Sequence, residues 1–452
     1  MKKFIVLLVL TTIIISCGKE VDYALISVKV ENAELKEINI TGNDFKKVIP
    51  VNEDGSFTDT LYLSEKGYYS LRAGRESTSV FLENGYNMNL TLDVKEFDES
   101  LTYTGEGAEI NNYLAAKYLK QEKLMGKPTE SYVLNEADFK TKMQAIKNTS
   151  DSLLAAARLG GDFEALEKEN IFYAYGTELL KYPSYHSHYA KKEGFEPGEG
   201  FYDELKDVNY QDETIYARIP SYRTLAANKL SSKFGENYDE HQSYSKAFLA
   251  TVEGLPKSTM KDEIMNGYIG FCLTTDENMD EVYNMYVSEV QNEEYKAKIE
   301  EKYSKIKNLV KGKPSPTFDY ENHKGGKTAL ADLKGKYVYV DVWATWCGPC
   351  KAEIPSLKKL EEDYHDKNIE FVSISVDRPD DYETWKKMVA EKELGGIQLM
   401  SDKDWKSDFV TGYAIEGIPR FILIDPDGNI VSADAPRPSN EKIRVLFEEL
   451  KI

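Results

Sequence analysis

Two cysteines with two residues between them stand at a change of pattern, in the stretch VDVWATWCGPCKAEIP of residues 340–355. The residues KYVYVDVWA form a near-continuous apolar run, which is typical of a strand in a sheet covered on both faces. The next segment, CKAEIPSLKKLEEDYHD, has helical periodicity and places four residues on one face: Ile354, Leu357, Leu360 and Tyr364. The stretch therefore predicts a buried strand followed by a helix that begins at the cysteine pair.

The position of Cys347-Gly348-Pro349-Cys350 at the predicted start of a helix has a chemical consequence. A helix N-terminus carries unpaired N–H groups and about half a positive charge, and these stabilise a thiolate, the nucleophile of disulfide exchange. Pro349 suits the first helical turn, where a missing N–H costs nothing. Cys347 lies nearer the end of the helix and is predicted to be the attacking sulfur. Cys350 lies one turn on, so it can close a disulfide with Cys347 and resolve a mixed disulfide.

Two more residues are candidates for this chemistry. Asp341 interrupts the apolar strand, and a lone buried carboxyl there should have a raised pKa and can take the proton of Cys350 during resolution. Pro419 in Gly417-Ile418-Pro419 stands just before the strand FILI, and a cis proline there would face the cysteines, its preceding backbone pairing with a bound peptide. The alternatives are an Asp341 at the exposed end of the strand and a Pro419 that only marks a strand boundary.

Other interpretations of the cysteine pair fit the sequence less well. A zinc ribbon needs a second close cysteine pair, which Cys17 and Cys272 cannot supply. A peroxiredoxin needs Thr or Ser three residues before its reactive cysteine, and Ala344 stands there. A structural disulfide between Cys347 and Cys350 would close a loop too short to stabilise much. A working redox pair remains the favoured interpretation.

Several of these residues match one known motif position by position: Asp341, Trp343, Trp346, Cys347-Gly348-Pro349-Cys350, Pro355, Ile418 and Pro419. On this basis residues 314–452 resemble the thioredoxin fold and, within it, the TlpA/ResA-like tethered thiol-disulfide oxidoreductases. The start Pro316-Thr317-Phe318 and the extra segment between Val376 and Ile418 are also similar to that subgroup. The motif is that of reducing thioredoxins, and it lacks the acidic residue that some cytochrome-maturation members carry between the cysteines.

The resemblance implies an α/β thioredoxin-like domain that acts as a protein disulfide reductase. It implies four catalytic residues: Cys347, Cys350, Asp341 and Pro419. It also implies four residues that contact the substrate: Trp346, Gly348, Pro349 and Ile418. No nicotinamide or flavin motif is present, and neither a cofactor nor a metal is predicted. The expected partners are protein disulfide substrates and a membrane electron-donor relay.

The N-terminus, MKKFIVLLVLTTIIISCGKE, has the proportions of an export signal. Its apolar run from Phe4 to Ile15 is shorter than the roughly 20 residues that a membrane-spanning helix needs. Ser16 followed by Cys17 resembles the lipobox of bacterial lipoproteins, which implies removal of residues 1–16 and lipid attachment to Cys17. The expected location is the cell envelope, with a lipid anchor in a bacterial membrane, most simply on the periplasmic side. The alternative is an ordinary signal peptide with a chance cysteine.

The region that follows the signal changes its periodicity once. Residues 22–105 contain short alternating segments such as ALISVKV, with turn signals at Asn52-Glu53-Asp54-Gly55 and Asn84-Gly85. This pattern predicts an antiparallel β-sandwich, and it is similar to the β domains ahead of thioredoxin modules in Bacteroidetes lipoproteins. Residues 106–310 have helical spacing with few β-branched residues, which predicts an all-α region with a loop-rich interruption near 182–222.

Three features of the helical region invite a functional interpretation. His186 and His188 are too few for a metal site, and their alternate spacing suits a surface loop. A cluster of tyrosines between Tyr182 and Tyr222 suits a recognition surface, but packing between helices is favoured. Cys272 stands among apolar residues, where a free cysteine is usually an inert small side chain.

The net charge of the chain argues against one class of partner. The chain carries 57 basic and 77 acidic residues, a formal net charge of −20, with no basic cluster. Because Lys and Arg supply most nucleic-acid affinity, a nucleic-acid partner is not expected. Two functions remain: an envelope-tethered disulfide reductase, or a lipoprotein that binds or scaffolds a ligand through residues 22–310, with the thioredoxin-like domain secondary.

Overall fold

The computed structural model describes residues 21–32, 35–42 and 45–452. These residues form two compact units, divided after Ser231, inside helix α7 (Pro220–His241). The predicted signal peptide and Cys17 lie outside the described residues. Within the described chain, no helix is both long enough and apolar enough to cross a membrane.

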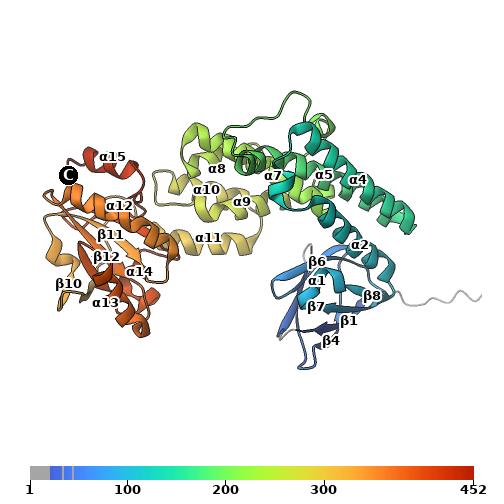
Figure 1. The fold of residues 1–452 in the computed structure, drawn as a ribbon, viewed down its shortest axis with the longest axis horizontal. Helices are drawn as coiled ribbons and strands as arrows, with labels where there is room; N and C mark the ends of the chain where they lie inside the picture. Colours follow the sequence, from blue (N-terminus) through green and yellow to red (C-terminus); the bar gives the residue numbers. More distant parts are fainter. Residues whose placement is uncertain (1–20, 33–34, 43–44) are drawn as a thin grey trace, which may run out of the picture. The chain divides into compact units, whose positions relative to one another are not determined.

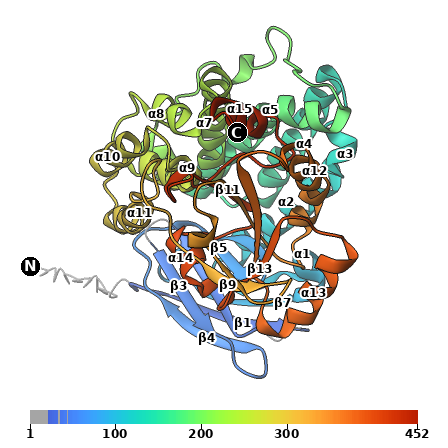
Figure 2. The same cartoon turned by 90° about the vertical axis from the view of Figure 1, so that its left-hand side faces the viewer.

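The first unit begins with two four-stranded sheets, drawn in blue in Figures 1 and 2. One sheet has the order β4 (Ser56–Leu61), β1 (Ala24–Glu31), β7 (Asn87–Asp93) and β8 (Thr102–Gly105). The other has the order β3 (Phe45–Pro50), β2 (Glu37–Gly42), β5 (Gly67–Ala73) and β6 (Glu76–Leu82). A short helix, α1 (Phe97–Ser100), precedes β8.

Alternation along the strands sends one set of side chains from both sheets into a shared core. In β1 the buried residues are Ala24, Ile26, Val28 and Val30, as the alternating pattern predicted. The two turn signals occur as predicted, but each connects strands of different sheets. The prediction of purely antiparallel pairing is wrong at one place, because β1 and β7 run parallel, with Val28 opposite Leu90. Strands far apart in sequence have no local signal that fixes their relative direction.

The chain becomes helical at Ala108, as the change of periodicity predicted. The helices between β8 and α7 are α2 (Ala108–Met125), α3 (Pro128–Ser131), α4 (Glu136–Ala157), α5 (Gly161–Ala190) and α6 (Glu213–Arg218). In the second unit α8 (Tyr244–Val252), α9 (Thr259–Cys272), α10 (Met279–Glu289) and α11 (Glu293–Ile306) follow. The domain limits suggested by the sequence stay predictions.

The predicted loop-rich segment starts later than expected, because α5 continues through Pro183 to Ala190. A proline inside a helix costs about 3 kcal/mol, so other contacts must compensate. Tyr182 is fully buried, stacks on Phe139 with ring centroids 4.3 Å apart, and donates a hydrogen bond to the Leu134 carbonyl at 2.7 Å. The packing and hydrogen bond of Tyr182, directly before Pro183, therefore help to keep this turn helical.

His186 does not lie in a surface loop. It is buried within α5, and its Nδ1 lies 2.7 Å from the Tyr132 carbonyl oxygen. Of these two histidines, only His188 is exposed. The apolar environment of α5 and the helical spacing explain the error, since His186 falls one turn after the buried Tyr182. Tyr182 and Tyr222 are both fully buried, in line with the packing role favoured for the tyrosine cluster.

One buried carboxylate connects the strands to the helices within the first unit. Glu167 of α5 accepts hydrogen bonds from the hydroxyls of Tyr68 in β5 and Tyr113 in α2, the latter at 3.1 Å. Lys117 of α2 forms an ion pair with the same carboxylate, and Asn170 donates to it at 3.0 Å. The side chain of Glu167 has no exposed surface. A buried charge is tolerated only with such complete pairing.

The last part of the second unit is built on a seven-stranded sheet, shown in orange and red in Figure 1. Its order is β10 (Lys327–Ala329), β9 (Asp319–Asn322), β13 (Ile397–Met400), β12 (Ile369–Ser375), β11 (Tyr337–Trp343), β14 (Arg420–Ile424) and β15 (Ile430–Ser432). The accompanying helices are α12 (Gly348–Tyr364), α13 (Tyr382–Glu391), α14 (Asp408–Gly412) and α15 (Lys442–Glu449). This confirms the predicted strand and helix alternation.

The central strand of this sheet is β11, which leads to the cysteine pair. It pairs in parallel with β12 and antiparallel with β14. Residues of α12 and α15 pack against it in one core cluster that includes Tyr339, Leu357, Leu360 and Phe447. The chain ahead of the sheet is held against β15, where the Ile430 N–H donates to the Lys313 carbonyl at 2.8 Å. The paired strands β12 and β14 therefore hold the end of β11 from both sides.

Candidate active site

The cysteine pair lies at the start of α12, where the sequence placed it. Cys347 is the N-cap residue, and its Sγ accepts a hydrogen bond from the Cys350 N–H at 3.1 Å. The two sulfurs form a disulfide, and the Cα atoms are 5.3 Å apart. A helix N-terminus aimed at the Cys347 sulfur is the arrangement that stabilises its thiolate once the disulfide is reduced.

The surface around the disulfide is formed by its neighbours in sequence. Each cysteine has only 4% of its surface exposed, whereas Trp346 is 56% exposed and Gly348 and Pro349 are also exposed. The centroid of the Trp346 ring lies 6.5 Å from that of Trp405. Trp405 belongs to the extra segment between Val376 and Ile418, and sequence reasoning missed it because no local pattern links this segment to the cysteines.

Asp377 holds the turn ahead of Cys347, and it too was missed. Its fully buried carboxylate accepts hydrogen bonds from the Thr345 N–H at 2.9 Å, the Thr345 hydroxyl at 2.8 Å and the Ser375 hydroxyl at 2.7 Å. The sequence carried one usable signal, an acidic residue directly after a buried parallel strand. The carboxyl ends of parallel strands lie at one edge of a sheet, so such a residue is well placed to fix a neighbouring turn.

Asp341 is in the middle of β11, opposite Ser373 of β12 and Phe421 of β14. Its Oδ1 is buried and has no hydrogen-bond partner among the described residues. Burial, and to a lesser extent the carboxylates of Glu353 and Glu361, raises the pKa of Asp341 to about 8. The prediction of a buried carboxyl with a raised pKa is confirmed, and the alternative of an exposed strand end is wrong. Asp341 and Cys350 line the same small cavity.

Replacing Asp341 by asparagine should stabilise the protein at neutral pH. The pKa of Asp341 rises from 3.8 to about 8 on folding. Between these values the unfolded chain has released a proton that the folded protein keeps, so the free energy of unfolding of the wild type falls as pH rises. Asparagine does not titrate, and the variant should gain about 4 kcal/mol at pH 7.

The measurement is urea unfolding followed by tryptophan fluorescence at pH 5, 7 and 8.5. All four tryptophans lie at or after Trp343, so the signal reports this part of the chain. Equal pH slopes for the wild type and Asp341→Asn would contradict the assignment of the raised pKa to Asp341.

Pro419 follows a cis peptide bond after Ile418, as predicted. In the pairing of β14 with β11, Arg420 is opposite Val342. Pro419, the next residue outward, is therefore at the same end of β11 as the turn that leads to Cys347. Contact of Ile418 and Pro419 with a substrate stays a prediction.

Comparisons with known proteins show what this chain is similar to. A family model described as the AhpC/TSA family matches residues 311–433. The thiol-disulfide oxidoreductase ResA of Bacillus thuringiensis strain Al Hakam is 30% identical over 142 residues, which are 31% of this chain and 78% of that protein. This chain belongs to the ResA thiol-disulfide oxidoreductase family. ResA of Bacillus cereus strain ATCC 10987 is 28% identical over 148 residues, 33% of this chain and 83% of that protein.

Solved structures are similar to about a third of this thiol-disulfide oxidoreductase. A protein from Bacteroides vulgatus, assigned as a thiol-disulfide oxidoreductase, is 51% identical and covers 32% of this chain and 92% of its own, with a TM-score of 0.28. A thiol:disulfide interchange protein from Bacteroides sp. is 32% identical and covers 32% of this chain and 93% of its own, with a TM-score of 0.29.

The remaining candidates of the sequence analysis lie apart from this oxidoreductase site. Cys272 is fully buried in α9, and burial raises the pKa of its thiol to about 12, which suits an unreactive side chain. Among the described residues, no group of three or more His, Cys, Asp or Glu side chains is arranged to hold a metal. Lipidation of Cys17 falls outside the described residues.

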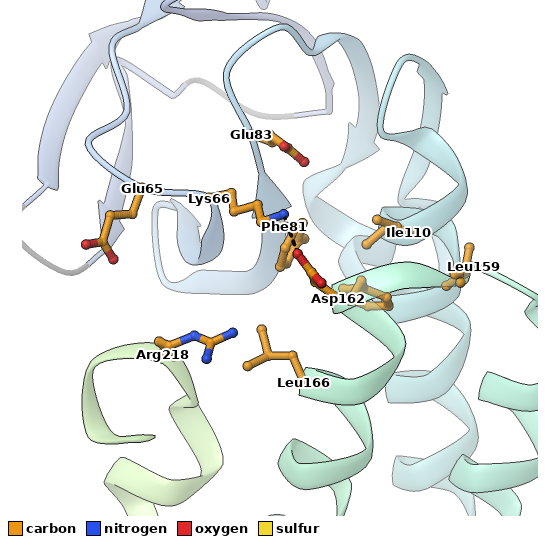
Figure 3. Close-up of a pocket in the computed structure, with 11 residues that line it drawn as sticks. Glu65, Lys66, Phe81, Glu83, Ile110, Leu159, Asp162, Leu166 and Arg218 are labelled. Carbon is orange, nitrogen blue, oxygen red and sulfur yellow. Dashed lines mark hydrogen bonds and ion pairs between the residues drawn. The ribbon is translucent and has the colours of Figure 1, made fainter. Parts of the chain in front are cut away.

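The first unit of this oxidoreductase contains a cavity of about 480 Å³, shown in Figure 3. An ion pair between Lys66 and Asp162, with Nζ and Oδ2 3.0 Å apart, lies in its wall. Glu65, Glu83 and Arg218 add further charge to the lining. No cysteine or histidine is among the residues that line it, so it has no redox group of its own.

Proposed function

We propose that this thiol-disulfide oxidoreductase is tethered in the bacterial cell envelope and reduces disulfides of other proteins through Cys347 and Cys350. The observation that carries the proposal is the position of the Cys347 sulfur as the N-cap of α12, with Asp341 and Cys350 in one buried cavity behind it. The motif Cys-Gly-Pro-Cys supports the direction, since reducing thioredoxins carry it. Trp346, Gly348, Pro349 and the backbone at Ile418 would contact the bound peptide.

The reaction transfers two electrons from the dithiol to the substrate. The Cys347 thiolate attacks one sulfur of the substrate disulfide, that bond breaks, and the released substrate thiolate takes a proton from solvent. Asp341 then accepts the proton of Cys350, and the Cys350 thiolate attacks the Cys347 sulfur of the mixed disulfide. The Cys347–Cys350 bond forms, and the second substrate thiolate leaves. Pro419 would position the peptide for both steps.

The disulfide form must be reduced again before another turnover. The chain has no nicotinamide or flavin motif. The resemblance to the TlpA/ResA-like proteins implies that the electrons would come from a dithiol donor in a membrane relay. Lipid attachment at Cys17, after removal of residues 1–16, would keep the protein at that membrane. The expected substrates are protein disulfides on the periplasmic side.

Two measurements on purified protein test the proposal. With dithiothreitol as the recycling reductant, the protein should accelerate reduction of insulin disulfides, and failure to do so would contradict it. The reduction potential should lie nearer to that of thioredoxin, about −270 mV, than to that of the oxidant DsbA, about −120 mV. A potential above about −150 mV would reverse the assignment to an oxidase.

The binding or scaffold function remains a second candidate because the first unit offers a cavity lined by charged residues. The two functions differ in one cellular result. If a Cys347→Ser gene fully restores the phenotype of a deletion strain, binding is the main function. If it does not, disulfide exchange is required.

A further inference from the structure

A small cavity behind the disulfide is lined by several polar groups besides the carboxyl of Asp341. It lies between α12, the strands β11 and β12, and the chain leading into β13. Its lining includes the polar groups of seven side chains: Asp341, Trp343, Cys350, Lys358, Glu361, Ser373 and Gln398. Its volume is about 10 Å³, close to what a single water needs.

Three buried atoms of the lining residues have no hydrogen-bond partner among the described residues: Asp341 Oδ1, Trp343 Nε1 and Gln398 Oε1. Two of them are acceptors and one is a donor. One water can donate to both acceptors and accept from the indole N–H, which leaves one lone pair for another group. The chemistry of the cavity therefore matches one bound water next to the carboxyl of Asp341.

Glu361 is the second carboxyl of this cavity, and the fold makes room for it. A Cβ atom at Gly395 would lie 2.1 Å from Glu361 Oε2, and one at Gly396 would lie 3.1 Å from Oε1. Gly395 has no positive φ that would require glycine, so its lack of a side chain is explained by the carboxyl that occupies the space. Glu361 keeps some exposed surface, and Oδ1 of Asp341 is buried, so the Glu361 carboxyl can exchange a proton with solvent where that Asp341 oxygen cannot.

The carboxyls of Asp341 and Glu361 have similar pKa values. Burial raises the pKa of Glu361 to about 7, and Lys358 opposes that rise. The pKa of Asp341, about 8, is raised first by burial and then by Glu353 and Glu361. The values are close enough for a proton to pass between the two groups in either direction near neutral pH.

We propose that Glu361 is the outer member of a proton relay, which carries the proton taken from Cys350 by Asp341 out to solvent through the water of this cavity. The proposal rests on the proposed disulfide exchange and deepens it. Cys350 loses its proton to Asp341, and its thiolate forms the bond to Cys347 as the substrate thiolate leaves. Asp341 then passes the proton to Glu361, which releases it to bulk water. Glu361 acts through Asp341 and touches no substrate atom, so it is a positioning residue.

The test compares Glu361→Gln with Glu362→Gln, a control on the same helix whose side chain is exposed. In the disulfide form, where the cysteines do not titrate, carbon-13 NMR follows the Asp341 carboxyl. Removing the facing carboxylate should lower the pKa of Asp341 by at least about half a unit. Resolution of a mixed disulfide preformed on Cys347 should slow roughly tenfold at pH 7 and recover above pH 9, where hydroxide takes the proton. The control should change neither value.

Gly395→Ala gives an independent variant, because its methyl group would displace the Glu361 carboxyl. It should slow resolution at pH 7 without slowing the first attack by Cys347. The relay is wrong if Glu361→Gln leaves the Asp341 pKa and the resolution rate unchanged, or if it slows the first attack to the same extent. If the wild-type mixed disulfide is not resolved at all, the proposed exchange reaction itself fails, which is a different result.

Discussion

Replacing Cys347 by serine is expected to abolish disulfide reduction, with a loss of at least about a thousandfold in rate. The hydroxyl of serine stays protonated at neutral pH, so the N-terminus of α12 has no thiolate to stabilise. The fold should be unaffected, because serine fits the same N-cap position and can accept the same hydrogen bond from the Cys350 N–H. Insulin reduction with dithiothreitol recycling measures the loss, and tryptophan fluorescence checks the fold.

Cys272→Ala is the control for this prediction. The thiol of Cys272 is buried, and it is the one cysteine of the described residues outside the disulfide. The variant should keep the full rate of reduction. A Cys347→Ser protein that retains activity, or a Cys272→Ala protein that folds but loses it, would move the chemistry away from the start of α12.

Replacing Glu167 by alanine is expected to cost the first unit about 3–5 kcal/mol of stability. The change removes the partner of Lys117, whose side chain is only 12% exposed, and leaves the hydroxyls of Tyr68 and Tyr113 without their acceptor. Glu167→Gln keeps the shape and the acceptor but not the charge, so it should cost less. Circular dichroism at 222 nm during urea unfolding measures the helical transition.

The control variant is Glu169→Ala, which changes an exposed carboxylate on the same helix and should stay within about 0.5 kcal/mol of the wild type. Tryptophan fluorescence should report an unchanged transition for Glu167→Ala, since every tryptophan lies in the second unit. A loss of less than about 1 kcal/mol would mean that the buried carboxylate does not hold strands and helices together.

The parts of the site that the sequence predicted are those with a local physical reason. The apolar run into Cys347 required a buried strand, and the proline between the cysteines suited the first turn of a helix. Asp341 stood out because a carboxyl is rare in such a strand. The cis bond before Pro419 followed from the resemblance to thioredoxins.

The parts that the sequence did not predict depend on contacts between distant segments. Asp377 and Trp405 approach the turn before Cys347 only after the sheet has formed. Glu361 is one of several acidic residues on α12, and only the approach of Gly395 distinguishes it. The helical path through Pro183 depends on Tyr182, whose partner Phe139 lies on another helix. Local patterns carry no information about such pairs.

The most direct test of the central claim is to trap the intermediate. Cys350→Ala removes the resolving sulfur and leaves Cys347 as the N-cap of α12. Incubated reduced with disulfide-containing envelope proteins, this variant should accumulate mixed disulfides, and mass spectrometry should place every one of them on Cys347. A Cys350→Ala protein that stays free of mixed disulfides, or carries them on Cys272, would contradict the account.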